Sequence, residues 1–194
     1  MSKIEQNRAM KKQAILTAAK SIFLSDGYSA ASMDKVASQA KLTKQTLYRY
    51  FPSKIELFHA ALENIGQSYN ERYSQHLALE NTRNALIAFA TEFMKFHLSQ
   101  EHIATMRLLI AEVNQAPEIV ESFMKMGADE TNHDLEAFFI ERFNLEKPKT
   151  KVELWIGMLL APRSGALLGM PSLTEEQVSE HAIEATDLLL SSVQ

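Results

Sequence analysis

Apolar residues recur along this chain at helical spacing, and we find no segment that alternates as a strand would. Ile15, Ala18, Ala19, Ile22 and Phe23 fall at i, i+3, i+4, i+7 and i+8, so they lie on one face of a helix. Asp26 and Gly27 follow, and a glycine suits the left-handed position at which many helices end. The pattern predicts a first helix over residues 8–25.

Capping residues and breakers divide the rest of the chain into further helices. Ser32 and Thr43 can each cap a short helix, the second of which cannot continue past Pro52. Ser53 and Glu56 form a capping box, which marks the start of a long helix. The helices predicted after the first cover about 32–40, 44–50, 53–78, 82–98, 99–114, 117–143 and 150–169, and a last helix follows Ser172 or Thr174. We therefore expect an all-α fold of about nine helices.

Charge separates the beginning of the chain from the rest. Residues 1–59 hold ten Lys and Arg against four Asp and Glu, and residues 60–194 hold ten against twenty, for a net charge of −4. A basic first part suggests contact with a polyanion, although the two parts could also differ by chance. We expect one domain over 1–56, linked through the helix of 53–78 to a second domain over 57–194.

The two short helices joined by "AKLT" have the spacing of a helix-turn-helix, whose second helix can enter a major groove. Leu47 and Phe51 lie one turn apart and are expected to face inward, with Leu42 sealing the turn. The other side of the second helix carries Lys44, Gln45, Thr46, Tyr48 and, near its end, Tyr50.

These polar side chains are of the types that contact DNA. Lys44 can donate to guanine or to a phosphate, Gln45 can pair with adenine, and the Thr46 methyl group can contact thymine. Tyr48 can donate to a phosphate oxygen, and Lys54 starts a helix whose N-terminus favours a phosphate. The alternative is that the tyrosines are packing residues and the lysines are only solvated.

Residues 14–62, "AILTAAKSIFLSDGYSAASMDKVASQAKLTKQTLYRYFPSKIELFHAAL", resemble the DNA-binding domain of tetracycline-repressor-like (TetR/AcrR-type) regulators. The resemblance is carried by the "F…GY" helix end, the block "VASQAKLTKQTLYRYF" and the "SK.EL" opening of the fourth helix. The later stretch "RLLIAEVNQAPEIVESF" is similar to the AefR-like branch of that family. One departure is Lys41, because the family usually has glycine in this turn. Lysine in a left-handed conformation costs on the order of 1 kcal/mol, so the turn is either reshaped or gains a phosphate contact from Lys41.

The resemblance implies a dimeric cytoplasmic transcription factor that binds a palindromic operator in double-stranded DNA. A small hydrophobic or amphipathic effector would bind in the larger domain and release a repressor from the operator. The resemblance also implies a four-helix bundle at the dimer interface. The residues it implies near DNA are Ser32, Met33, Thr43, Lys44, Gln45, Thr46, Tyr48, Tyr50 and Lys54.

The second domain is rich in methionine and aromatic residues, which fill ordinary cores and also line adaptable apolar cavities. With the family resemblance, we expect a ligand pocket formed by Phe89, Phe93, Phe96, His97, Met106, Phe123, Met126, Trp155 and Met158. His97 and Arg163 are candidate polar anchors for the ligand. Alternatively, the histidine is a satisfied core residue and the arginine forms an ion pair or an interface contact.

Small residues at every fourth position, Gly157, Ala161, Gly165 and Gly169, predict a smooth stripe against which another helix can pack closely. The last helix carries a matching apolar line of Val178, Ala182, Ala185 and Leu189. Together they predict an isologous dimer, or else packing of the same stripe inside one chain.

Other classes of function find little support in the sequence. A nucleophile elbow, a glycine-rich phosphate loop and HExxH spacing are all missing, and His97 with Glu101 is too weak a pair to indicate a metal, so no enzyme, cofactor or metal is expected. The most apolar stretch, 154–170, contains Pro162 and Arg163, which favours a buried helix over a membrane span. The chain has no cysteine, which fits a reducing cytosol. A helix-turn-helix regulator that responds to a protein partner, or to no effector, remains the alternative function.

Overall fold

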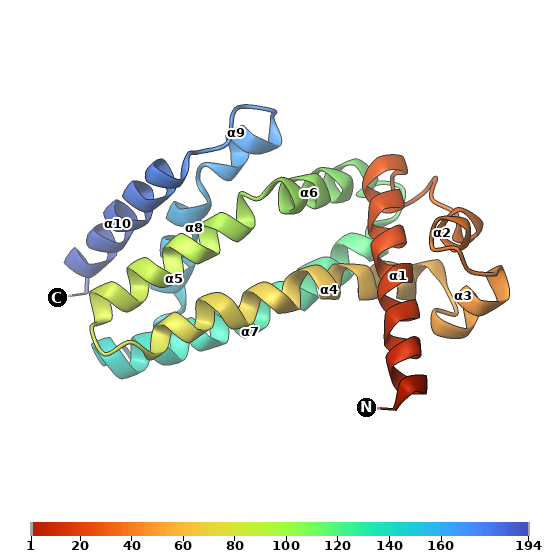
Figure 1. Ribbon diagram of the computed structural model, residues 1–194. Helices are drawn as coiled ribbons and strands as arrows, with labels where there is room; N and C mark the ends of the chain where they lie inside the picture. The colour runs from red at the N-terminus through yellow and green to blue at the C-terminus, as the bar shows by residue number, and fades with distance from the viewer. Residues whose placement is uncertain (1, 194) are drawn as a thin grey trace. The chain divides into compact units, whose positions relative to one another are not determined.

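The computed structural model describes residues 2–193, and within them the side chains outside 65–72 and 125–130. In this part of the chain every regular element is a helix (Figure 1), so the predicted all-α class is confirmed. The elements are α1 (Lys3–Asp26), α2 (Met33–Gln39), α3 (Lys44–Tyr50), α4 (Lys54–Ser74), a 3-10 helix η1 (Gln75–Ala78), α5 (Thr82–His97), α6 (Gln100–Glu112), α7 (Pro117–Phe143), α8 (Lys149–Leu160), α9 (Arg163–Leu167) and α10 (Glu175–Ser191).

The chain forms two compact units. The first comprises Met1–Gly66 and Arg107–Met126, and the second comprises Gln67–Met106 and Gly127–Gln194. The first unit therefore contains the end of α6 and the beginning of α7 as well as α1, α2 and α3. The sequence did not indicate that residues 107–126 belong with the basic first part of the chain.

An apolar core holds the first three helices together in the first unit. Phe23 near the end of α1 packs against Tyr28 and Phe58, with ring centroids 5.8 Å and 5.1 Å away, respectively. The rings of Tyr28 and Phe58 are 5.1 Å apart. Ile15 of α1 and Leu47 of α3 are fully buried. Burial of such side chains stabilises the unit by about 1.5–3 kcal/mol each, and it fixes α3 with its opposite face outward.

Helix α1 begins five residues before the predicted start at residue 8. Ser2 and Glu5 form a capping box, in which the Ser2 N–H donates to the Glu5 carboxylate over 2.7 Å and the Glu5 N–H donates to the Ser2 hydroxyl over 3.2 Å. The first two turns of α1 are exposed, so they carry no apolar periodicity. The capping pair was the signal in the sequence that could have revealed them.

In the second unit α5, α8 and α10 lie side by side (Figure 1). Trp155 of α8 is fully buried and stacks on Phe89 of α5 at 5.8 Å between ring centroids. Tyr73 and Phe139 complete this aromatic core. Aromatic rings bury a large apolar area each, and here they bring the three helices into contact.

The single helix predicted over 150–169 is wrong. Helix α8 ends at Leu160, and α9 begins at Arg163. Pro162 has no N–H to donate, and its ring clashes with a carbonyl four residues earlier in a continuous helix. The Ala161 N–H instead donates over 3.2 Å to the Met158 carbonyl, only three residues earlier, which closes a tighter turn than that of an α-helix.

Candidate nucleic-acid interface

Two capped helices form the helix-turn-helix, as the sequence predicts. The Ser32 hydroxyl accepts from the Lys35 N–H at the start of α2, and the Thr43 hydroxyl accepts from the Thr46 N–H at the start of α3, both over 3.2 Å. The hydroxyls of Thr43 and Thr46 are also 2.8 Å apart. These local bonds satisfy N–H groups that a helix start leaves without partners, and they set where each helix begins.

The turn keeps a regular shape with lysine in place of glycine. Lys41 has a φ of 55°, in the left-handed region, so the turn is not reshaped to avoid this conformation. This conformation lets the Leu42 N–H donate to the Ala37 carbonyl over 2.9 Å and the Lys41 N–H donate to the Ser38 carbonyl over 3.0 Å. Both bonds belong to a Schellman end of α2. The Lys41 side chain is exposed.

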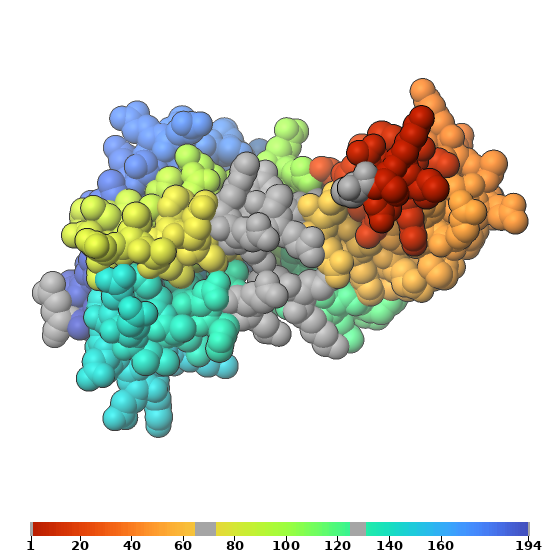
Figure 2. Space-filling model, turned by 60° about the horizontal axis from the view of Figure 1, so that its bottom comes forward, coloured from red at the N-terminus to blue at the C-terminus, as the bar shows by residue number. Residues whose placement is uncertain are grey.

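Helix α3 has one inward and one outward face. Leu47 is fully buried, and Phe51, which follows the helix, is 6% exposed. Figure 2 shows the residues of α2 and α3 (orange) at the surface beside α1 (red). Lys44, Gln45 and Arg49 are exposed, and Tyr48 is 40% exposed. Arg49 is an outward-facing cation that the sequence reasoning did not select, and only its charge could have suggested it.

Lys44 is held by an acid from the neighbouring helix. Its ammonium group lies 2.7 Å from the Asp34 carboxylate of α2 and 6.0 Å from the centre of the Tyr48 ring. The hydrogen bond to Asp34 raises the pKa of Lys44. Since both groups are exposed, such a pair contributes little and can be exchanged for another anion at small cost.

Lys54 turns inward, toward the loop between α1 and α2. Its ammonium group donates to the carbonyls of Tyr28, Ser29 and Ala31 over 2.9–3.2 Å and lies 4.5 Å from the centre of the Tyr28 ring. An ammonium group has three donors, and this geometry engages all of them. The predicted phosphate contact of Lys54 stays a prediction, and the structure adds a role in holding this loop.

The same loop is also held by Glu112, at the end of α6. The Glu112 side chain is buried and accepts from both the N–H and the hydroxyl of Ser29. These bonds from Ser29 and the charge of Lys54 lower the pKa of Glu112, against the effect of burial, which raises it. Gly27 has a φ of 84°, and a Cβ there would lie 2.8 Å from the Glu112 carboxylate. Sequence reasoning missed the contact between Ser29 and Glu112 because these residues are 83 positions apart in the chain.

The other predicted DNA contacts have varied exposure. Ser32 and Thr43 are exposed, Thr46 and Tyr50 are half-buried, and Met33 is 8% exposed. The predicted DNA contact of Met33 stays a prediction. The predicted set thus lies on α2, α3 and the start of α4, all within the first unit.

The predicted ligand residues divide between the two units. Most lie in the second unit, where Phe89, Phe93, Phe96 and Trp155 are buried and His97, Met106 and Met158 are half-buried. Phe123 lies in the first unit, and the side chain of Met126 falls outside the described residues.

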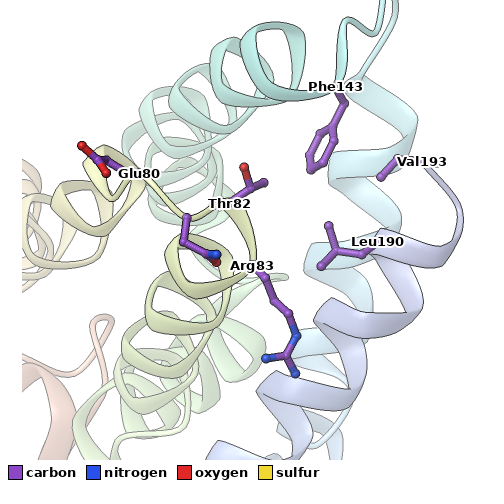
Figure 3. A pocket seen from close by; sticks show the side chains of 7 residues that line it. Glu80, Thr82, Arg83, Phe143, Leu190 and Val193 are labelled. Atoms are coloured by element: carbon purple, nitrogen blue, oxygen red, sulfur yellow. The ribbon is translucent and has the colours of Figure 1, made fainter.

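None of these residues lines either of two surface hollows. One hollow, of about 530 Å³, lies in the second unit at the start of α5 and the end of α10 (Figure 3). Phe143, Leu190 and Val193 form one side of it, while the Arg83 guanidinium extends toward α10, where it makes two bonds to Asp187 of 2.7 and 2.8 Å. The other hollow, of about 520 Å³, lies in the first unit and is lined by Met10, Gln13, Ala14, Thr17, Ala18, Gln39, Ala40 and Lys41.

The predicted dimer residues also separate into two groups. The apolar line of α10 is buried inside the chain, where α10 packs on α5 and α8. For these residues the structure therefore shows packing within one chain, which was the alternative to a dimer interface. This line consists of Val178, Ala182, Ala185 and Leu189. The small-residue stripe crosses the break at Pro162; Gly157, Ala161 and Gly169 are exposed and Gly165 is half-buried.

In the part of the chain that the structure describes, no helix is long and apolar enough to cross a membrane. The same residues contain no group of three or more His, Asp or Glu side chains that could hold a metal ion.

An outward-facing, capped second helix on an all-α scaffold defines a helix-turn-helix protein.

Comparison with known proteins agrees with this class. Residues 15–61 match the family described as bacterial regulatory proteins, tetR family, and residues 84–144 match the AefR-like transcriptional repressor, C-terminal domain. The chain belongs to the TetR family of regulators, in its AefR-like branch.

Relatives and solved structures extend the match. The uncharacterized HTH-type transcriptional regulator YhgD of Bacillus subtilis is 35% identical over 118 residues, which are 56% of this chain and 61% of that protein. A TetR-family regulator from Mesorhizobium loti has a TM-score of 0.82 at 22% identity, with 95% of this chain and 96% of that chain covered. The flavonoid-responsive regulator FrrA has a TM-score of 0.76 at 27% identity, with 95% and 97% covered.

The curated relatives are matched over only part of their length. The matched stretch spans 26%, 61% and 32% of three of them. Several curated relatives are named repressors and one is named an activator.

Proposed function

We propose that this protein is a dimeric, sequence-specific DNA-binding repressor that a small aromatic effector releases from its operator. The observation that carries the DNA-binding part is the outward face of α3, where Lys44, Gln45, Tyr48 and Arg49 stand exposed on a helix that is anchored by buried Leu47. Family membership supports the same assignment. The cytoplasm is where such a regulator would work.

The side chains of α3 divide the work of recognition. Gln45 and Lys44 read base edges in the major groove, and Lys44 exchanges Asp34 for DNA as it does so. Tyr48 and Arg49 contact phosphates, which sets the position of α3 along the duplex but carries no sequence information. The exposed Lys41 side chain, beside the turn, adds a further phosphate contact.

A homodimer would bring two such helices to successive major-groove faces, 34–36 Å apart by the geometry of B-DNA, roughly one helical turn. Exposed apolar residues on two adjacent helices support this: Leu154 of α8 is 65% exposed and Leu188 of α10 is 60% exposed. Gly157 and Ala161 share the face of α8 with Leu154 at i, i+3 and i+7. We assign the dimer surface to these residues, in place of the buried line of α10.

An aromatic effector is supported by the second unit. The Trp155 indole N–H and the Thr186 hydroxyl are buried without a hydrogen-bond partner among the described residues. A buried polar group without a partner costs about 1–3 kcal/mol, which a ligand can recover. FrrA, 27% identical to this chain, is described as flavonoid-responsive.

Binding to DNA is tested by selecting operator sequences from random duplexes and then measuring affinity by gel shift at several salt concentrations. Replacing Gln45 with Ala should relax the selected sequence, whereas Tyr48→Phe should weaken all sites by about 1 kcal/mol. Lys147→Ala, in an exposed loop, is the control and should leave binding unchanged. Binding that ignores sequence and salt would refute the proposal.

The close packing of the predicted ligand rings favours a second function, that of a regulator without a small-molecule effector. Phe89 and Phe93 stack at 5.6 Å, and neither surface hollow reaches them. The second unit would then be only a dimerisation scaffold, in a regulator controlled by a protein partner or by no effector. Absence of any aromatic compound that changes the melting temperature or DNA affinity would favour this alternative.

A further inference from the structure

The segment that carries the helix-turn-helix, residues 28–54, contains a single carboxylate. This is the side chain of Asp34, in the first turn of α2. The same segment contains five cations, at Lys35, Lys41, Lys44, Arg49 and Lys54. An acid on a surface that binds a polyanion weakens binding through like-charge repulsion, so Asp34 lowers the affinity for DNA unless it has a further role.

Asp34 is paired with a residue of the recognition helix. One oxygen of its carboxylate lies 2.7 Å from the ammonium group of Lys44 in α3, and the other accepts a hydrogen bond from the same group over 3.0 Å. Helices α2 and α3 lie next to each other in the first unit (Figure 1). The side chains of Lys44 and Asp34 are 59% and 64% exposed, so DNA can compete with Asp34 for this cation.

Other cations of the segment lack such a competitor. Lys41 and Arg49 are exposed, and neither forms an ion pair among the residues that the structure describes. They can therefore contact the phosphates of any DNA sequence. Lys44 differs from them, because its charge is already neutralised by a carboxylate in the free protein.

The pairing affects a phosphate and a base edge differently. Exchanging Asp34 for a phosphate only replaces one anion with another at an exposed site, and it leaves the carboxylate of Asp34 unpaired beside the negatively charged backbone. A guanine edge in the major groove instead offers Lys44 two acceptors, O6 and N7. The exchange is therefore favourable at an operator base and unfavourable at a phosphate.

We propose that Asp34 is a specificity-determining residue, which keeps Lys44 from the phosphates of unselected DNA and releases it to a base of the operator. This inference rests on the proposed function, in which Lys44 reads base edges, and it names the residue that confines this contact to the operator.

The test measures the affinity of the full chain for the selected operator and for a random duplex of equal length, by fluorescence anisotropy at several salt concentrations. Asp34→Asn leaves Lys44 unpaired, so the random duplex should bind more tightly. The slope of log affinity against log salt should steepen by about 0.9 for each bound subunit, which is an additional loss of about threefold between about 50 and 200 mM salt. Operator affinity should change less, so the ratio of the two affinities should fall. Asp34→Ser, which also removes the charge, should behave in the same way.

The double variant Asp34→Asn/Lys44→Gln separates action through Lys44 from direct repulsion by Asp34. It has the net charge of the wild type and should bind the random duplex with wild-type affinity and slope, while the operator is weakened. Weaker binding of the random duplex with a shallower slope would mean that Lys44 contacts phosphates in the wild type, which would overturn the inference. So would tighter binding, which would mean that Asp34 repels DNA without acting through Lys44.

Asp187→Asn is the matched control, because it removes the acid of another exposed ion pair, with Arg83 in the second unit. It should leave both affinities unaltered, and an effect equal to that of Asp34→Asn would reduce the result to net charge and overturn the inference. A lower melting temperature as the only effect of Asp34→Asn would also overturn it, since Asp34 would then act only on the helix dipole of α2. If the wild-type chain binds both duplexes equally, the proposed regulator itself fails; if it prefers the operator, these outcomes remove only the role of Asp34.

Discussion

Two histidines with lowered pKa values, half-buried His97 and buried His102, should make the second unit acid-sensitive well above the pH at which carboxylates titrate. Burial is the main cause that lowers the pKa of His97 to about 3 and that of His102 to about 4, against an ordinary value of 6.5. In the unfolded chain both return to the ordinary value. Between pH 4 and 6.5 the unfolded state therefore binds more protons than the folded state, and stability falls as the pH is lowered.

The size of the effect follows from these pKa values. Moving from pH 7 to pH 5 protonates each histidine in the unfolded state only, which costs the fold about 2 kcal/mol for each residue. The pair together corresponds to about 4 kcal/mol, a large part of the 5–15 kcal/mol that roughly describes a folded protein. For a chain of this size we expect the melting temperature to fall by about 10 °C over that interval.

The assay is thermal and urea unfolding of the wild-type chain and of His97→Gln/His102→Gln at half-unit steps from pH 7.5 to 5. Glutamine can still donate to the Phe93 carbonyl but does not titrate, so the double variant should lose most of the slope. Glu112, whose pKa is lowered, contributes stability that is lost only below its unfolded value near 4.5, outside this interval. His133→Gln is the control, since this residue is exposed. Identical slopes for the wild type and the double variant would refute the reasoning.

Two further predictions concern the loop contact and the dimer. Gly27→Ala should destabilise the first unit by about 1–3 kcal/mol, because alanine is strained at a φ of 84° and its Cβ meets Glu112. In urea unfolding, part of this loss of stability should disappear when Glu112 is also replaced with Ala. Strict additivity of the two changes in unfolding free energy would contradict the contact. Leu188→Glu should shift the sedimentation of the chain from dimer to monomer, whereas Leu79→Glu, at another exposed leucine, should not; a dimer that is unaffected by Leu188→Glu would exclude this surface.

Local signals were enough to predict the helix-turn-helix. Ser32 and Thr43 cap their helices, and Pro52 follows the end of α3. Each of these features depends on bonds or steric contacts between residues at most five positions apart, which the order of residues along the chain already contains. The sequence by itself therefore determined the all-α class, the positions of α2 and α3, and which face of α3 is apolar.

Contacts between distant segments needed the tertiary structure. The sequence could not tell that Lys54 would turn to the loop carbonyls or that Glu112 would hold Ser29. The apolar line of α10 fitted a dimer and a core equally well, because periodicity reports that a face is buried but not what covers it. Only the packing of α10 on α5 and α8 decided that Val178 and Leu189 belong to the core of their own chain.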